Sequence, residues 1–493
     1  MQENSQAHLA AIHFIEQREK LLLIDGKWVP AVSGKTFETV NPSTEQVLSH
    51  VAEADKVDVD LAVKAARKAF EDPSWADITP HQRGSYLNRI ARLIEEHGKE
   101  LTYLDALDYG TPVSVLQMFV NASVQLFDYF AGWPTKIFGK TAPTDGSIFN
   151  YTLREPLGVC GIIIPWNSPF WSVVYKIAPA LAAGNTVVIK PSELTPLSIL
   201  RFGELLLEAG LPAGVVNILP GYGPTAGAAI VEHPDVNKIS FTGSTPTGKG
   251  IIKSAADSLK RVSVELGGKS PLIIFEDADV DKAIQSAILG FTLNTGQVCV
   301  SSSRVFVHES IYEEVSAKLI AIVNQIKIGD GLIPDSQIGP LTSQKQLDKV
   351  ESYIALGKEE GATLAAGGAR VGTSGYFIQP TVFTHVKNGM RLAQEEIFGP
   401  VVALIPFKDE DDAVLQGNDT VYGLSASFWT KDVSRAHRVA KKIKAGIIWI
   451  NTIYEIDPIL PFGGYKLSGY GKDNGEDSIN EYTQVKTVML RLS

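Results

Sequence analysis

Cys299 is the side chain in this sequence best suited to nucleophilic chemistry. It stands in the segment NTGQVCVSSS, after Gly296 and Gln297 and before a run of serines. A polar neighbourhood that contains glycine suits a thiol that a substrate must reach, and its thiolate is a strong nucleophile. The other cysteine, Cys160, lies in an apolar run that is typical of a small buried residue.

Glu265 is the candidate general base. It ends the apolar run VSV and is followed at once by a Gly-Gly pair. A carboxyl group at a strand end beside glycines can stand in a cleft, where desolvation raises its pKa and lets it take a proton from water. A helix cap or a surface ion pair is an equally ordinary use of one glutamate, so the residue type alone leaves this open.

Four apolar runs end in residues that suit a dinucleotide. These residues are Pro165, Trp166, Asn167, Lys190, Glu193, Gly221, Gly223, Gly243 and Ser244. Ligands of an open parallel sheet bind beyond the carboxyl ends of its strands, and a Gly-Ser turn before a helix suits a phosphate. Glu193 can accept hydrogen bonds from ribose hydroxyls, which favours NAD over NADP. GYGPTAG has one residue more than the G-x-G-x-x-G spacing, so a simple tight turn stays an alternative.

The elements that would position these residues alternate between strand and helix. GVCGIIIP, TVVIKP, VVNILPG and KISFTG are continuous apolar runs, typical of parallel strands that are buried on both faces. Helical periodicity marks 57–70, 82–97 and 197–209. After Gly267 the pattern starts again, with strands PLIIFE, SSRVFVH, VVALIPF and IIWIN and helices over 280–293, 311–326 and 434–442. The sequence therefore predicts two open α/β domains.

Composition excludes several classes of protein. With 493 residues, 44% of them hydrophobic, and a net charge of −10, the chain is typical of a globular protein that repels nucleic acid. Two cysteines exclude a disulfide framework and a thiolate-rich zinc site. No apolar run approaches the roughly 20 residues of a membrane span, and MQENSQAHLAAIHFIEQREK does not resemble a secretory signal. We expect a cytoplasmic enzyme without a metal.

Seven motifs occur in the order seen in NAD(P)-dependent aldehyde dehydrogenases: PWNSP, KPSE, FTGSTPTGK, ELGGKSP, NTGQVC, EEIFGP and PFGGYKLSGYG. The resemblance runs from about Gly26 to the C-terminus. It implies a Rossmann-like cofactor domain over 1–138 and 156–266, a catalytic domain over 267–467, and a small β oligomerisation element formed by 139–155 and 480–493. It also implies a homodimer or homotetramer.

The resemblance assigns a role to each catalytic candidate. Cys299 resembles the nucleophile, Glu265 the base that activates water, Asn167 the amide donor to the oxyanion, and Lys176 a proton-relaying lysine. The residues that it assigns to the cofactor, NAD rather than NADP, are Ile163, Pro165, Trp166, Lys190, Ser192, Glu193, Gly223, Phe241, Gly243, Ser244, Gly248, Leu266, Glu396 and Phe398.

The expected substrate wall is apolar and aromatic with a few hydroxyl groups. It comprises Ser168, Trp171, Ser172, Tyr175, Leu293, Tyr454, Ile456 and Phe462, together with Phe170 and Ile453. Ser168 departs from the family, which often has Phe there. No Arg or Lys stands among these positions to bind a substrate carboxylate, so we expect a medium-chain aliphatic or aromatic aldehyde. Asp473 and Gln484 also depart from the family, since many relatives carry Glu at both.

Three other functions compete with this one. A thioesterase or esterase would use Cys299 and Glu265 without redox chemistry. An acylating enzyme would pass the acyl group to coenzyme A and would not need Glu265. A binding protein on a retired scaffold would be expected to lose the nucleophile or the base, and both are present.

Overall fold

The β-branched runs form the centre of the first sheet. Among residues 2–17 and 19–492, which the computed structural model describes, eight strands pair in the order β18-β10-β9-β6-β7-β8-β1-β2. β10 to β8 are parallel, while β18, β1 and β2 are antiparallel additions at the two edges. The bounds are β1 Leu22–Ile24, β2 Lys27–Val29, β6 Val159–Ile163, β7 Thr186–Lys190, β8 Val216–Ile218, β9 Lys238–Thr242, β10 Arg261–Glu265 and β18 Gly469–Tyr470.

Successive residues of these strands enter two different cores, which explains why the runs are apolar at every position. Cys160 and Ile162 of β6 pack in one core, while Val159 and Ile163 pack in the other. Adjacent side chains of a strand point to opposite faces, so a sheet covered on both sides is apolar throughout. The helices of this half are α1 Gln2–Glu16, α2 Lys56–Glu71, α3 Pro73–Ala76, α4 Pro80–Tyr109, α5 Val113–Ala131, α6 Pro169–Ala182, α7 Leu197–Glu208, α8 Ala228–Glu232 and α9 Thr245–Ala256.

Helix α4 is much longer than the predicted helix over 82–97. A capping box between Thr79 and Gln82 starts it, and Gly110, with φ 86°, ends it. Beyond Gly98 most of its residues are buried, from Leu101 to Tyr109. A helix covered on all sides shows no amphipathic period, so its second half left no signal in the sequence.

The second sheet has seven strands within the described part of the chain, in the order β13-β14-β15-β12-β11-β16-β17. The sequence prediction missed β13, β14 and β16. The run SASFW of β16 is fully buried but contains small and polar residues instead of β-branched ones. The bounds are β11 Pro271–Ile274, β12 Arg304–His308, β13 Thr363–Ala366, β14 Thr381–Thr384, β15 Val401–Phe407, β16 Ser425–Trp429 and β17 Ile447–Ile450. The helices of this half are α10 Val280–Thr292, α11 Tyr312–Val323, α12 Gln344–Glu359, α13 Arg391–Gln394, α14 Glu410–Asn418 and α15 Val433–Lys442. Helix α16 Gly475–Glu481 returns to the first body, where Ile479 joins its hydrophobic core.

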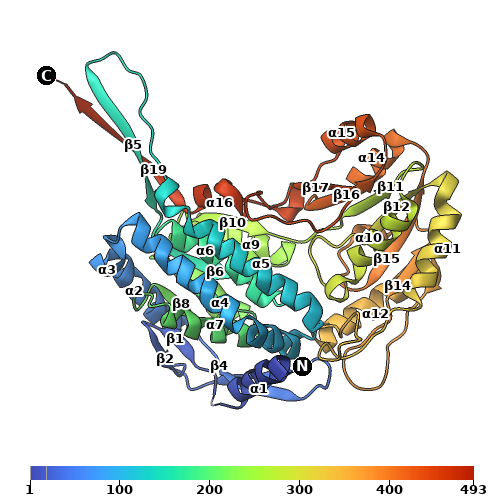
Figure 1. Cartoon of the computed structure of the whole chain (residues 1–493), viewed down its shortest axis with the longest axis horizontal. Helices are drawn as coiled ribbons and strands as arrows, with labels where there is room; N and C mark the ends of the chain where they lie inside the picture. Colours follow the sequence, from blue (N-terminus) through green and yellow to red (C-terminus); the bar gives the residue numbers. More distant parts are fainter. Residues whose placement is uncertain (1, 18, 493) are drawn as a thin grey trace.

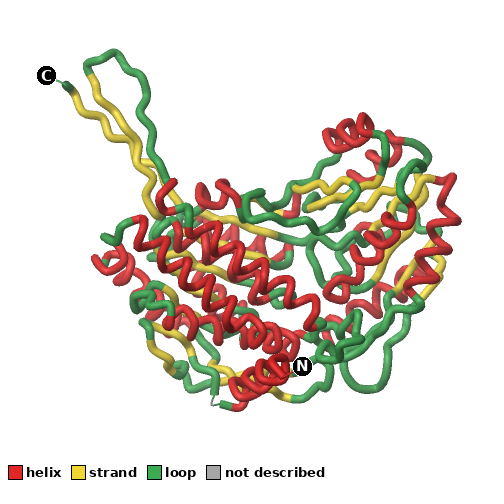
Figure 2. The backbone as a smooth tube through the Cα atoms, in the orientation of Figure 1, coloured by secondary structure: helices red, strands yellow, loops and turns green. Residues whose placement is uncertain are grey.

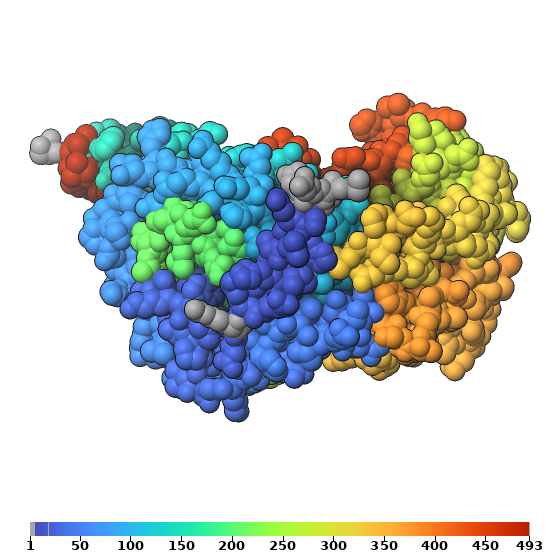
Figure 3. Space-filling model, turned by 60° about the horizontal axis from the view of Figure 1, so that its bottom comes forward, coloured from blue at the N-terminus to red at the C-terminus, as the bar shows by residue number. Residues whose placement is uncertain are grey.

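The two α/β bodies lie side by side, with helices over the faces of both sheets (Figures 1 and 2). The α/β class with two largely parallel sheets confirms the predicted fold class. Seen from below, the N-terminal half adjoins the segment around residues 330–400 (Figure 3). Here the Val113 N–H donates to the Gly331 carbonyl oxygen over 3.0 Å.

A two-stranded arm projects from the first body (Figure 1). It pairs β5 Ile148–Pro156 with β19 Thr483–Arg491 in antiparallel register, Thr483 opposite Pro156. A separate hairpin joins β3 Thr36–Val40 and β4 Val47–Ala52. Several apolar side chains of the arm are exposed: Phe149, Leu153, Val485, Met489 and Leu490. The domain boundaries given above stay predictions.

Candidate active site

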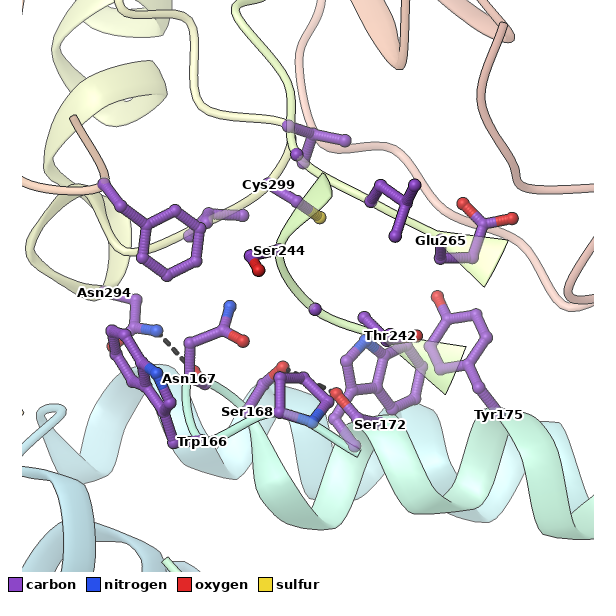
Figure 4. A pocket seen from close by; sticks show the side chains of 18 of the residues that line it. Trp166, Asn167, Ser168, Ser172, Tyr175, Thr242, Ser244, Glu265, Asn294 and Cys299 are labelled. Atoms are coloured by element: carbon purple, nitrogen blue, oxygen red, sulfur yellow. Dashed lines mark hydrogen bonds between the residues drawn. The ribbon is translucent and has the colours of Figure 1, made fainter. Parts of the chain in front are cut away.

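A cavity of about 330 Å³ lies between the two bodies at the carboxyl ends of β9 and β10. The loop that carries Cys299 closes it from the second body, and the start of α6 closes it from the first. Cys299 and Glu265 lie above the row formed by Asn167, Ser168 and Ser172 (Figure 4). All four predicted catalytic residues line this cavity.

A strained turn places Cys299. After α10 the chain passes through Asn294, Thr295 and Gly296 with φ values of 51°, 56° and 72°. The left-handed region costs a non-glycine residue about 1 kcal/mol or more, so contacts must hold this turn. The Asn294 amide donates to the carbonyl oxygens of Asn167 and Gln297 over 2.5 and 3.3 Å. Asn294 therefore ties the loop that carries Cys299 to Asn167, just before the start of α6.

The Cys299 thiol is partly exposed to the cavity but surrounded by protein. Burial, with the nearby carboxyl groups of Glu396 and Glu265, raises the pKa of Cys299 to about 12. The backbone N–H groups of Val300 and of Cys299 itself act in the opposite direction. At neutral pH, Cys299 is therefore a thiol that needs a proton acceptor before it can attack.

Asn167 follows the end of β6 and is buried. One of its amide N–H groups donates to the Gln297 carbonyl oxygen over 2.8 Å. An amide nitrogen carries two N–H groups, so a second donor is available on the cavity side. The bond to Gln297 fixes the amide beside the segment that leads into Cys299.

Glu265 is the last residue of β10, and its side chain is buried. Neither of its carboxyl oxygens has a hydrogen-bond partner. Burial and the charge of Asp473 raise the pKa of Glu265 well above the usual range, while Lys176 and Lys472 act in the opposite direction. An unpartnered carboxyl group in a reactant cavity is the arrangement that a general base requires.

Lys176 lies two helical turns after Ser168 on α6 and is almost fully buried. Its ammonium group donates to Asp473 over 3.0 Å. Asp473, which the sequence analysis noted only because many relatives carry Glu at that position, lines the same cavity. The structure thus groups Glu265, Lys176 and Asp473, and Lys176 is the one cation in direct contact with either carboxyl group among the ion pairs of the described residues.

The predicted cofactor residues fall into two groups. Pro165, Trp166, Gly243, Ser244, Leu266, Glu396 and Phe398 line the cavity. Ile163, Lys190, Ser192, Glu193, Gly223, Phe241 and Gly248 do not line it, and they lie on or near the ends of β6 to β9 and the start of α9.

Contacts of backbone and side chains hold the surface at the ends of β7 and β9 in shape. Lys190 donates to the carbonyl oxygens of Pro191 and Gly221 over 2.6 and 2.8 Å, and lies 3.7 Å from Glu193. Burial lowers the pKa of Lys190 to about 8, while Glu193 acts in the opposite direction. Ser244 caps α9 by accepting from the Thr247 N–H over 3.4 Å.

These residues fit a dinucleotide. A Cβ at Gly223 would meet no atom within 4 Å, so the backbone there is open to a ligand. A Cβ at Gly243 would lie 2.5 Å from the Phe241 ring, so this turn before α9 requires glycine. Helix N-termini favour negative charge, which suits a diphosphate. Glu396 accepts from the Gly268 N–H over 3.0 Å, and burial raises its pKa.

All eight predicted substrate residues line the cavity. Phe170 and Ile453, however, belong to the two hydrophobic cores, and their placement in the wall was wrong. Phe170 lies on the face of α6 opposite to the cavity and packs against Phe202 there, with their ring centroids 5.3 Å apart. Ile453 packs beside Gly290 of α10.

The sequence analysis missed several residues that line the cavity: Phe119, Thr242, Gly267, Asn294, Val298, Val300, Gln346 and Lys349. Phe119 of α5 stacks on Trp171 at 6.2 Å. Gln346 donates to the carbonyl oxygens of Ile397 and Phe398 over 3.1 and 2.6 Å and so holds Phe398, whose φ is 63°. The quoted motifs held a signal for four of these residues: Thr242 in FTGSTPTGK, Gly267 in ELGGKSP, and Asn294 and Val298 in NTGQVC.

Two kinds of feature are absent from residues 2–17 and 19–492. There is no group of three or more His, Cys, Asp or Glu side chains placed to hold a metal ion. No helix in this part of the chain is long and apolar enough to cross a membrane.

Comparisons with known proteins agree with this geometry. The model described as "Aldehyde dehydrogenase family" matches residues 28–488. Aldehyde dehydrogenase 1A1 of Mus musculus is 48% identical over 482 residues, which cover 96% of this chain and 95% of that enzyme. Aldehyde dehydrogenase family 2 member B4, mitochondrial, of Arabidopsis thaliana is 48% identical over 474 residues, covering 96% and 88%. The NAD+ complex of an aldehyde dehydrogenase from Bacillus cereus superposes with a TM-score of 0.97 at 48% identity and covers 98% of both chains.

Proposed function

This chain belongs to the aldehyde dehydrogenase family and oxidises aldehydes with a nicotinamide cofactor, and from that premise we propose that the reaction passes through a thioester on Cys299. The observation that carries this proposal is the presence of Cys299 and an unpartnered, buried Glu265 in one cavity. The family is the one that the seven motifs indicated.

The Cys299 thiol gives its proton to water as its sulfur attacks the aldehyde carbon, which forms a tetrahedral thiohemiacetal. The carbonyl oxygen then carries the developing negative charge. The Asn167 amide and the Cys299 N–H are the donors that we assign to it, since fixed donors stabilise such an oxyanion. Loss of hydride from this adduct would leave a thioester on Cys299, and a bound nicotinamide dinucleotide would supply the hydride acceptor.

Glu265 takes a proton from the water that attacks the thioester, and the carboxylic acid leaves as the Cys299 sulfur departs. The raised pKa of Glu265 makes it a stronger base than an ordinary carboxylate. Lys176, bound to Asp473, stands beside this carboxyl group and is the residue that we assign to moving the proton onward.

We assign NAD rather than NADP as the preferred cofactor. Glu193 lies 3.7 Å from Lys190 at the end of β7, where a carboxylate would accept hydrogen bonds from ribose hydroxyls and repel a 2′-phosphate. The aromatic wall formed by Trp171, Tyr175 and Tyr454 supports a medium-chain aliphatic or aromatic aldehyde.

The exposed apolar arm supports assembly into a homodimer or homotetramer. An isolated two-stranded ribbon is marginally stable in water, and its exposed edges and apolar side chains favour a second copy of the chain. Light scattering of the purified protein tests this assignment. The cytoplasmic location expected from the sequence stays a prediction.

The experiment that tests the function measures NADH formation with NAD and a panel of aldehydes, for the native protein and two variants. Cys299→Ala should abolish turnover, whereas Cys160→Ala should retain it, because Cys160 is buried in β6 away from the cavity. NADH formation that survives Cys299→Ala would contradict the thioester mechanism.

The same preparation separates the competing functions. A free carboxylic acid as product, with or without added coenzyme A, supports hydrolysis by Glu265. An acyl-coenzyme A product would favour the acylating enzyme, and ester hydrolysis faster than NADH formation would favour the esterase. The absence of turnover with every aldehyde, together with NAD binding, would favour a retired scaffold.

A further inference from the structure

One face of α6 forms the floor of the aldehyde side of the cavity. Ser168, Trp171, Ser172, Tyr175 and Lys176 recur at the spacing of one helix face, and all five line the cavity. They form two adjacent ridges with different chemistry. Trp171 and Tyr175 make an aromatic ridge, with ring centroids 4.4 Å apart. The other ridge is polar and begins with two serines.

The two serine hydroxyl groups contact each other. The Ser168 and Ser172 oxygens lie 3.1 Å apart, one helical turn from each other, on the cavity side of α6 (Figure 4). No other hydrogen bond engages either hydroxyl among the contacts of the described residues. Two hydroxyl groups carry two protons, and their mutual bond uses one. One donor and several lone pairs remain for a ligand.

Ser168 occupies a position where serine usually has a different task. It is the N-cap residue of α6, yet its side chain accepts no hydrogen bond from the helix. An N-cap serine normally accepts from the second or third backbone N–H of its helix, which stabilises the helix. Here the hydroxyl is directed to Ser172 and the cavity instead.

The surrounding hydroxyl and amide groups make this pair distinct. Tyr454 lines the same cavity, but its hydroxyl donates to the Gly290 carbonyl oxygen over 2.8 Å, so Tyr454 presents its ring. Asn167, directly before Ser168, is assigned to the oxyanion. Tyr175 also carries a hydroxyl group, but its ring belongs to the aromatic ridge. The serine pair is therefore a pair of hydroxyl groups in this wall with no assigned role in the chemistry, and Ser168 directly follows the residue assigned to the oxyanion.

We propose that Ser168 and Ser172 form a subsite for a hydroxyl group carried on one of the first carbons after the aldehyde carbonyl. The preferred substrate is then a hydroxylated aldehyde with an apolar remainder, which packs on the Trp171–Tyr175 ridge. The proposal rests on the proposed function, because it assumes that the carbonyl lies between Cys299 and Asn167.

The test compares aldehydes that differ by a hydroxyl group against a methyl group of similar size. 3-Hydroxybutanal and 3-methylbutanal form one pair, and 3-hydroxybenzaldehyde and 3-methylbenzaldehyde form another. The native enzyme should show kcat/KM values about tenfold higher for the hydroxylated member of at least one pair, the scale of one well-placed hydrogen bond.

Variants assign this preference to the serines. The double change Ser168→Ala with Ser172→Ala should bring the ratio of the two kcat/KM values close to one, and Ser172→Thr, which keeps a hydroxyl, should preserve part of it. Ser85→Ala is the matched control, since Ser85 is an exposed serine of α4 whose hydroxyl donates to the His81 carbonyl oxygen. It should leave the ratio unchanged.

The outcomes separate this proposal from its premise. Equal kcat/KM for both members of each pair in the native enzyme overturns the subsite and leaves aldehyde oxidation intact. An equal loss for both members in the double variant also overturns it, since the serines would then hold a water or the helix instead. Absence of any aldehyde oxidation overturns the proposed function and this proposal together.

Discussion

At the end of β7, the Lys190 ammonium group donates hydrogen bonds to two backbone carbonyl oxygens, whereas at the end of β10 neither carboxyl oxygen of Glu265 has a hydrogen-bond partner. Both groups are buried and lie on the same sheet. The Lys190 ammonium group is satisfied before any ligand arrives, whereas the Glu265 carboxyl group is buried with no hydrogen bond to offset its desolvation. The difference separates groups that shape a binding surface from groups kept free to react.

Glu265→Gln, at the end of β10, is the change with the largest expected effect. The amide fills the same space but cannot accept a proton, so turnover of the aldehyde should fall by about 10²- to 10⁴-fold. A burst of NADH equal to the enzyme concentration should remain, because hydride transfer precedes hydrolysis. Stopped-flow absorbance measures both. Steady-state turnover within threefold of the native enzyme would show that the free carboxyl group is not the base.

The native pH profile adds a second measurement of the same group. Because the pKa of Glu265 is raised, its carboxyl group stays protonated to a pH well above 4.5 and cannot act as a base there. The rate of thioester hydrolysis should therefore fall as the pH is lowered through that raised pKa. This acidic limb should be absent from the residual activity of Glu265→Gln. A limb at the ordinary carboxylate pH would contradict the assignment.

Asn167→Ala should have the next largest effect. Loss of one oxyanion donor typically lowers kcat by about 10²- to 10³-fold. The change also removes the bond to Gln297, so loop displacement is a competing cause. Asn167→Asp keeps the size of the side chain but supplies no hydrogen-bond donor. Its kcat should be at least as low as that of the alanine variant. Fast turnover in either variant would remove Asn167 from the mechanism.

Glu193→Ala tests the other region of the comparison, the end of β7, where Lys190 is already hydrogen-bonded. Without the Glu193 carboxylate, the charge that repels a 2′-phosphate and the acceptor for the ribose hydroxyls are both gone, so the ratio of kcat/KM for NAD to that for NADP should fall by about tenfold or more. Glu208→Ala, an exposed change on α7, is the control. An unchanged cofactor ratio for Glu193→Ala would count against the ribose contact.

The smallest expected effect is on stability. A carboxyl group whose pKa is raised by folding binds its proton more tightly in the folded state, so the stability that it gives is present at low pH and is lost as the pH rises through the raised pKa. Glu265→Gln should therefore raise Tm by roughly 1–3 °C at pH 8 and by less at pH 5. An equal rise in Tm at both pH values would mean that desolvation of the Glu265 carboxyl group does not lower the stability of the folded protein.

Local sequence signals were sufficient where one residue type or one short run decides the outcome. The apolar runs of β6, β7 and β9 are buried on both faces, as their composition predicted. The residue types of Cys299 and Glu265 marked them only as candidates, and it was the resemblance of the surrounding motifs that assigned them to one site, where both line the cavity. Phe119 and Asp473 could not be found in this way. The contact of Asp473 with Lys176 joins residues 297 positions apart, and only the fold brings them together.

Sequence proximity also gave wrong placements. Phe170 adjoins Trp171 in the chain, but successive residues of a helix are turned by about 100°, so one faces the core and the other the cavity. The sequence did not predict strand β16, because several of its buried residues are small or polar. These errors share one cause, since burial depends on what covers a residue and not on its neighbours in sequence.

The arm has a consequence for the order in which the molecule is made. Arg154 of β5 donates to Thr483, the first residue of β19, across 329 positions of chain. At about 5–20 residues per second, β5 leaves the ribosome roughly 15–65 s before its partner strand exists. During that interval both of its edges are open to any other strand. Polysomes that carry many nascent copies therefore hold many unpaired β5 segments close together, and slow translation of the second half would prolong the time in which they can meet.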